Sequence, residues 1–164
     1  MSVLPILRWP DARLSQPCAA FGADMDGVAE LAADMLDTMY DAPGRGLAAP
    51  QVGVLKRLFV MDVNGKAGPR CPRVFVDPVI EARTDETAFG PEGCLSIPGI
   101  QAQVARAVGI TLSWRDLDGT ARRETLSGFS AICAQHEIDH LDGLVTLDRV
   151  SPADRAALEA QYRP

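Results

Sequence analysis

The sequence predicts a single α+β domain spanning residues 1–164, in which antiparallel β-sheets pack around a central helix with an HEXXH motif. Hydrophobic residues make up 47% of the chain, enough for one ordinary core. Helical spacing of apolar residues appears near the two ends of the chain, and strand-like segments lie between them. Because strands and helices do not alternate regularly, a doubly wound parallel sheet is not expected.

An N-terminal amphipathic helix is expected from Asp26 to about Tyr40, since apolar residues recur at helical spacing with acidic residues on the other face. The stretch DAPGRGLAAPQVG follows and is predicted to be a loop, because glycine and proline are dense in it. RLFVMDVN and RVFVDPVI are predicted strands. GITLSWRDLDGTARRETLSG is predicted to form two more, joined at Asp118-Gly119, a dipeptide typical of hairpins.

The last third of the chain predicts two helices. Ser127 suits the N-cap of the first, and Gly143 suits the residue just past its last turn. Ser151 and Pro152 suit the cap and first position of a short C-terminal helix.

Composition narrows the class of protein. The formal net charge of -6 argues against a nucleic-acid-binding surface and against binding to an anionic membrane. The apolar run in MSVLPILRWP is too short for a signal peptide or membrane span, so a cytoplasmic location is expected. The cysteines are widely scattered in a chain with ample core, so disulfides are not expected, and without a CxxC pair any thiolate ligand must come singly. They are Cys18, Cys71, Cys94 and Cys133.

The segment AICAQHEIDHLDG contains both histidines of the chain, His136 and His140. At this spacing they project from one side of a helix, one turn apart, and can bind one metal ion. Phe129, Ile132 and Cys133 fall on the same face, so the pair should point into the core. The alternative is two core histidines bonded to backbone carbonyls. Glu137, beside the first histidine, favours the metal site, because its carboxylate can serve a metal-bound water.

A catalytic zinc-type site needs a third protein ligand. Cys94, in PEGCLSIPG, is a candidate, although taken alone it is more typical of a small core residue than of a ligand. HEIDH, EGCLS and GRGLAAPQ together closely resemble the three motifs of the peptide deformylase family, in the same order and at similar separations. The resemblance covers essentially the whole chain.

The resemblance implies a metallo-amidohydrolase that removes the formyl group from N-formylmethionyl peptides. It implies Cys94, His136 and His140 as metal ligands with water in the fourth position. Fe(2+) is the expected ion, and Zn(2+), Ni(2+) or Co(2+) are expected to substitute. The other implied roles are Glu137 as general acid and base, the Gln51 side-chain amide and Leu95 backbone N–H as oxyanion donors, and the backbone of Gly44, Arg45 and Gly46 as the strand that pairs with the substrate.

Arg45 departs from the family pattern, which usually has an aliphatic residue between the two glycines. A second departure is GIQAQ, where family members often have an arginine. Both concern the substrate groove, and Arg45 predicts a preference for acidic residues after the formylated methionine, unless its side chain points away. Asp139 is expected either to face solvent or to pair with a cation such as Arg106 or orient an imidazole. Glu92 is expected to hold the cysteine loop.

Three other functions are compatible with parts of the sequence. A related amide hydrolase acting on another small N-acylated substrate has Arg45 as its only support. A zincin-type endopeptidase is weaker, since nothing suggests a carboxylate third ligand. A noncatalytic metal-binding or ribosome-associated module is disfavoured because Glu137 and Gln51 are both present. A transient contact with the ribosome exit region is compatible with the function, but the C-terminal helix has balanced charges and gives no sign of an RNA site.

Overall fold

The computed structural model describes residues 2–65 and 67–164. Its larger sheet is antiparallel and has the strand order β1-β2-β3-β6-β7. These strands are β1 (Gly46–Ala48), β2 (Leu58–Met61), β3 (Arg73–Arg83), β6 (Gly109–Arg115) and β7 (Ala121–Ser127). The smaller sheet is one long hairpin of β4 (Thr87–Cys94) and β5 (Ile97–Ala107).

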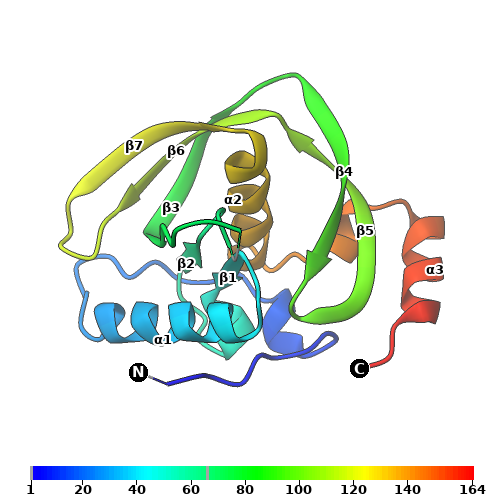
Figure 1. Cartoon of the computed structure of the whole chain (residues 1–164), viewed down its shortest axis with the longest axis horizontal. Helices are drawn as coiled ribbons and strands as arrows, with labels where there is room; N and C mark the ends of the chain where they lie inside the picture. Colours follow the sequence, from blue (N-terminus) through cyan, green and yellow to red (C-terminus); the bar gives the residue numbers. More distant parts are fainter. Residues whose placement is uncertain (1, 66) are drawn as a thin grey trace.

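Three α-helices and three short 3-10 helices complete the described part of the chain. The α-helices are α1 (Val28–Asp41), α2 (Gly128–Leu141) and α3 (Pro152–Gln161), and the 3-10 helices are η1 (Ala12–Ser15), η2 (Ala49–Val52) and η3 (Thr146–Arg149). Helix α2 lies in the centre, between the larger sheet and the β4–β5 hairpin, and α1 and α3 lie outside (Figure 1). The predicted α+β class and antiparallel sheets are therefore confirmed.

Strand β2 is buried on both faces, which explains why its four residues are all apolar. Phe59 and Met61 join the core cluster under α2, whereas Leu58 and Val60 join the cluster under α1. Side chains of a strand alternate between its faces, so one short segment connects both helices to a single sheet.

Two segments without a predicted helix or strand form regular structure. The stretch after α1 contains the edge strand β1 and the helix η2, because its backbone pairs with β2 over Gly46–Ala48. The segment that ends at Cys94, for which the sequence predicted no regular element, is the eight-residue strand β4. Gly90, Pro91 and Gly93 weaken its local strand signal. The segment is nevertheless a strand because it pairs along its length with β5, whose side chains alternate between buried and exposed.

Both ends of α2 lie where the sequence predicts. Ser127 is the N-cap residue, although its side chain makes no capping hydrogen bond, so that part of the expectation is wrong. At the other end the N–H of Gly143 donates to His140 O at 3.1 Å and that of Leu144 donates to Asp139 O at 2.8 Å, the pattern of a Schellman motif. Gly143 has φ 80°, and a Cβ there would lie 2.9 Å from a backbone atom of Gln16. Glycine is therefore required on both counts.

The remaining turns agree with the sequence. The β6–β7 hairpin turns at Asp116–Thr120 with Gly119 at φ 84°, as in a type I turn followed by a left-handed residue. The Ser151 hydroxyl caps α3 by accepting from the N–H of Asp154. All four cysteines are free. No helix in the described ranges is long and apolar enough to cross a bilayer.

Candidate metal centre and active site

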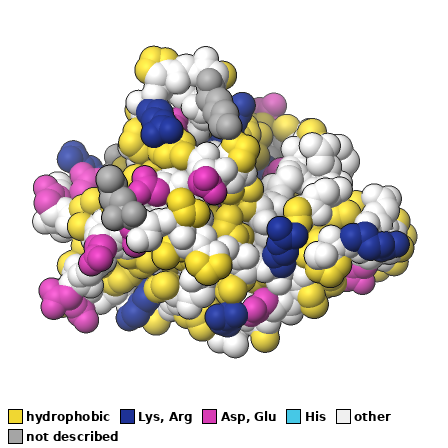
Figure 2. All heavy atoms as spheres, turned by 60° about the horizontal axis from the view of Figure 1, so that its bottom comes forward, with side chains coloured by type: hydrophobic (Ala, Val, Ile, Leu, Met, Phe, Trp, Pro, Cys, Tyr) yellow, Lys and Arg dark blue, Asp and Glu magenta, His cyan; other side chains and the backbone are white. Residues whose placement is uncertain are grey.

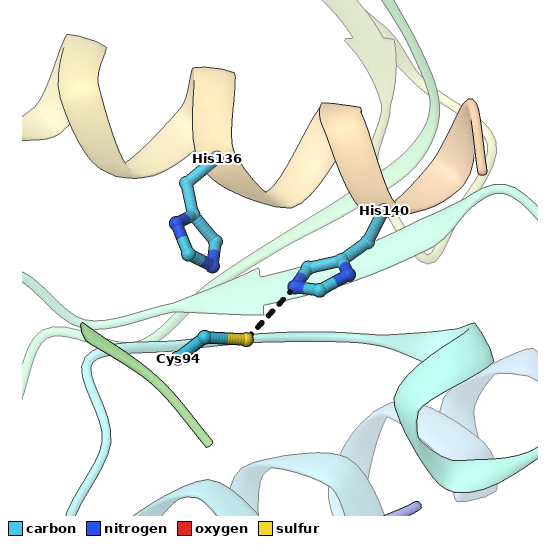
Figure 3. Close-up of side chains that lie close together, drawn as sticks. All are labelled: Cys94, His136 and His140. Carbon is cyan, nitrogen blue, oxygen red and sulfur yellow. Dashed lines mark hydrogen bonds between the residues drawn. The ribbon is translucent and has the colours of Figure 1, made fainter. Parts of the chain in front are cut away.

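Cys94, His136 and His140 converge at one point between the two sheets (Figure 3). Their ligand atoms lie within 4.8 Å of one another, and Cys94 Sγ lies 3.4 Å from His140 Nε2. The two imidazoles come from successive turns of α2, and the thiol comes from the last residue of β4. The structure thus brings together the three residues that the sequence predicts as ligands. No histidine is visible on the face in Figure 2, in keeping with this buried position.

His136 is oriented by Glu92. The Nδ1 atom of His136 lies 2.9 Å from Glu92 Oε1 and, when protonated, donates to it, which leaves the Nε2 lone pair free for an ion. Burial alone would raise the pKa of Glu92, but hydrogen bonds and charge from His136 and Arg106 outweigh it and lower the pKa to about 2. Glu92 was expected to hold the cysteine loop, and its contact with the imidazole is a further role that the sequence did not predict.

A buried ion-pair network lies behind His136. Arg106 donates to both Glu92 carboxylate oxygens at 2.9 Å and to Asp139 Oδ2 at 2.6 Å. Arg149 donates to Asp139 from the outer side, with Nη2 2.7 Å from Oδ1. The side chains of Glu92, Arg106 and Asp139 are each less than a tenth exposed. Asp139 therefore pairs with Arg106, one of the two alternatives, and every charge in the network is matched.

Gln51 and Ser96 lie on the other side of the thiol. The Gln51 Nε2 donor lies 3.7 Å from Cys94 Sγ and 3.1 Å from Ser96 Oγ, and its Oε1 accepts from the N–H of Ala48. Because the amide oxygen is held by the backbone, its NH₂ group must face the ligand cluster. Leu95 follows Cys94 in the β4–β5 turn and lines the same groove as Cys94 and His136.

Glu137 lies beside His136 and is almost completely buried. Burial raises its pKa to about 7, and its Oε2 atom has no hydrogen-bond partner among the described residues. Gly46 makes this position possible, because a Cβ there would lie 2.6 Å from Glu137 Oε1 and 2.9 Å from Cys133 Sγ. A buried, unpartnered carboxylate with a pKa near neutrality is typical of a group that exchanges protons.

A groove of about 530 Å³ leads to this cluster. One wall is formed by residues 43–46 before and within β1, the other by residues 88–95 of β4 and its turn, and α2 contributes the floor. Arg45 lies at the rim with its guanidinium carbon 5.1 Å from the centroid of the Phe129 ring. Phe129 was expected to face the core, but it is 46% exposed, because it belongs to the first turn of α2 at the open end of the groove.

The three predicted ligands fit a divalent metal. One thiolate and two imidazoles form a donor set suited to iron(II) or zinc, and they leave a fourth position for water or substrate. They come from two elements, α2 and β4, and the imidazole of His136 has the carboxylate support typical of ligating histidines.

A family model described as polypeptide deformylase matches residues 3–156. A peptide deformylase from Zymomonas mobilis is 42% identical over 162 residues, covering 96% of this chain and 92% of that protein. The chain belongs to the polypeptide deformylase family. Enzymes of this family hydrolyse the N-terminal formyl amide of nascent polypeptides, so the predicted family and class of reaction are confirmed.

Solved peptide deformylases have the same fold. A plant enzyme matches with a TM-score of 0.90 at 34% identity, over 98% of this chain and 90% of that one. A structure from Acinetobacter baumannii with Met-Ala-Ser bound matches with a TM-score of 0.85 at 33% identity, over 92% of this chain and 100% of that one.

Sequence reasoning missed several contacts around the site. The link from Glu92 to His136 had a usable signal, because Glu92 and Cys94 are two residues apart in a strand and therefore share a face. Ser96 beside Gln51 and Arg149 beside Asp139 had none, since both contacts depend on how distant segments pack.

Proposed function

We propose that residues 1–164 form one catalytic domain that hydrolyses the formyl group from formylmethionyl ends of newly made polypeptides and releases formate. The observation that carries this proposal is the convergence of Cys94, His136 and His140 beside the buried carboxylate of Glu137, at the inner end of a groove.

The substrate peptide is proposed to bind as an added strand. β1 is an edge strand of the larger sheet, and among the described strands β4 pairs with β5 alone, so each turns an unpaired edge toward the groove. An extended peptide can pair with Gly44–Gly46 on one side and with β4 on the other. The related Acinetobacter baumannii structure, which holds Met-Ala-Ser, supports this class of ligand.

The methionine side chain is proposed to rest on α2. Ile132 and Cys133 lie one turn before His136 and line the groove together with Val104 of β5. This floor is apolar and adjoins the ligands, so it suits an unbranched thioether side chain next to the scissile formyl group.

The proposed chemistry assigns one task to each polar group. When bound, a divalent metal would supply Lewis acidity and lower the pKa of a water, so that this water can lose a proton and act as the nucleophile near neutral pH. Glu137 takes the proton of the attacking water and returns it to the leaving amine, as its pKa of about 7 favours. The Gln51 side-chain amide and the Leu95 backbone N–H donate to the formyl oxygen as negative charge develops, and one such donor is worth about 3 kcal/mol.

Fe(2+) is proposed as the working ion, with Zn(2+), Ni(2+) or Co(2+) able to replace it, because the Cys94 thiolate suits soft and borderline metals. We propose that the protein acts in the cytoplasm, where nascent polypeptides emerge, and that it contacts the ribosome exit region transiently. The charges on the face in Figure 2 are scattered and of both signs, so on that face any such contact does not rest on a basic patch.

Deformylation is tested with anaerobically prepared protein on formyl-Met-Ala-Ser and acetyl-Met-Ala-Ser. We expect formate release from the first peptide and no deacylation of the second, because the acetyl methyl group occupies space that the formyl hydrogen leaves free. Equal turnover of both peptides would indicate a broader N-acyl hydrolase. Iron-loaded protein should lose activity in air faster than nickel-loaded protein, and equal lifetimes would count against iron as the working ion.

A further inference from the structure

Arg45 is the exposed, unpaired charge of the substrate groove. Among the described residues lining the groove, the other charged side chains are Glu92, Arg106 and Glu137, and all three are buried. Glu92 and Arg106 neutralise each other. No described carboxylate lies within ion-pair distance of Arg45, which leaves its guanidinium free to meet a ligand.

The Arg45 side chain is held in place at the rim. Its guanidinium lies over the Phe129 ring, and its stem passes Gly65, where a Cβ would lie 3.1 Å from Arg45 Nε. The Arg45 carbonyl accepts from the N–H of the buried Asp62. Stacking on an aromatic face leaves the N–H edge of a guanidinium open to a carboxylate, and a side chain that is already ordered loses less entropy on binding.

Helix α2 gives the separation between Arg45, which lies over Phe129, and the predicted metal ligand His136. Phe129 and His136 are seven residues apart on α2, which is about two turns or roughly 10 Å. An extended peptide advances about 3.3 Å per residue, and side chains two residues apart share a face. With the methionine side chain on α2, the second residue after methionine has its side chain on the same face, about two strand steps nearer to Arg45.

We propose that Arg45 is a specificity-determining residue that pairs with an acidic side chain on the second residue after the formylated methionine. This inference rests on the proposed function. A protein with net charge -6 would by itself repel acidic peptides, so any preference for them must arise locally.

The test compares kcat/KM for formyl-Met-Ala-Asp-Ser and formyl-Met-Ala-Lys-Ser, both with C-terminal amides so that only the side chain supplies a carboxylate. We expect the aspartate peptide to be favoured about tenfold at low salt, and the ratio to fall as salt screens the charges. Arg45→Gln should bring the ratio to about one with metal content unchanged. Arg163→Gln removes the same charge from an exposed C-terminal site outside the groove and should keep the wild-type ratio.

An Asp-to-Lys ratio that is the same in wild-type protein and Arg45→Gln would overturn the inference while leaving deformylation intact. The inference would also be overturned if aspartate raised kcat/KM directly after the methionine, in formyl-Met-Asp-Ala-Ser amide, but not one residue later, in formyl-Met-Ala-Asp-Ser amide. Absence of formate release from every peptide, including the neutral formyl-Met-Ala-Ala-Ser amide, would instead contradict the proposed function and with it the inference.

Discussion

The two sides of the groove differ in how their polar groups are held. On the inner side, Glu92, Arg106 and Asp139 are buried and bonded to one another and to His136. At the rim, Phe89 is 79% exposed and Phe129 46% exposed, and Arg45 is charged without an ionic partner among the described residues.

This difference matches the demands on each side. Ligands must hold one geometry, and a buried network in which every charge has a partner resists displacement because an opened pair leaves a desolvated charge. The rim meets polypeptides whose sequence varies after the methionine, so apolar surface and one exposed cation suffice there. Variants on the inner side should therefore affect metal and catalysis, and variants at the rim should affect substrate choice and stability.

The largest effect is expected from loss of a ligand. Cys94→Ala and His136→Ala should each lose most bound metal and reduce activity by about 10³-fold or more, because the nucleophile is no longer generated at neutral pH. Elemental analysis with a formate assay measures both. Cys71→Ala, which removes an exposed thiol, should retain full metal. Stoichiometric metal in either ligand variant would show that the ligand assignment is wrong.

Glu137→Gln separates catalysis from metal binding. The amide keeps the shape of the side chain but cannot accept the proton, so turnover should fall by about 10² to 10⁴-fold while the metal stays bound. Steady-state kinetics beside metal analysis tests this. Glu30→Gln on the exposed face of α1 is the matched control and should behave as wild type. A variant with metal and near-normal turnover would remove Glu137 from the mechanism.

Glu92→Gln should weaken metal binding by about 10 to 100-fold, because the imidazole of His136 loses its anionic acceptor. Competition with a chelator gives the affinity. Asp139→Asn disturbs the same network without touching an imidazole, and it should reduce stability with a smaller loss of affinity. Equal losses of affinity in both variants would mean that the network acts as a whole and not through the contact with His136.

Asp62→Asn tests the rim support. Burial alone would raise the pKa of Asp62, but hydrogen bonds from the Tyr40 hydroxyl and the N–H groups of Cys71 and Asn64 lower it below its ordinary value of 3.8. The carboxylate therefore stabilises the fold above about pH 4, and this contribution is lost as the pH falls through the lowered pKa.

Urea unfolding should show Asp62→Asn less stable by about 1 to 3 kcal/mol at pH 7, with the difference shrinking below about pH 4. Asp26→Asn, at an exposed position, should match wild type throughout. A difference that stays constant down to pH 3 would rule out a contribution from the charge of Asp62.

Local patterns predicted much of the fold. The ends of α2, the cap of α3 and the β6–β7 turn depend on backbone geometry within a few residues, and the sequence located all of them. Strand β4 was not predicted, because its glycines and proline weaken the local strand pattern and its structure depends on pairing with β5. The contact of Glu92 with His136 joins residues 44 positions apart, and its local signal was the strand face that Glu92 shares with Cys94.

By itself the sequence determined the chemical types at the site. The spacing of His136 and His140 puts two imidazoles on one helix face wherever that helix lies, and the family motifs point to Cys94 and Glu137. Only the tertiary structure decided that the Cys94 thiol reaches His140 across 46 residues, that Arg106 neutralises Glu92 and that Arg45 stacks on Phe129 at the open rim. Helical periodicity is set by neighbouring peptide units, whereas these contacts depend on sheet register and packing between segments that the chain brings together only when it folds.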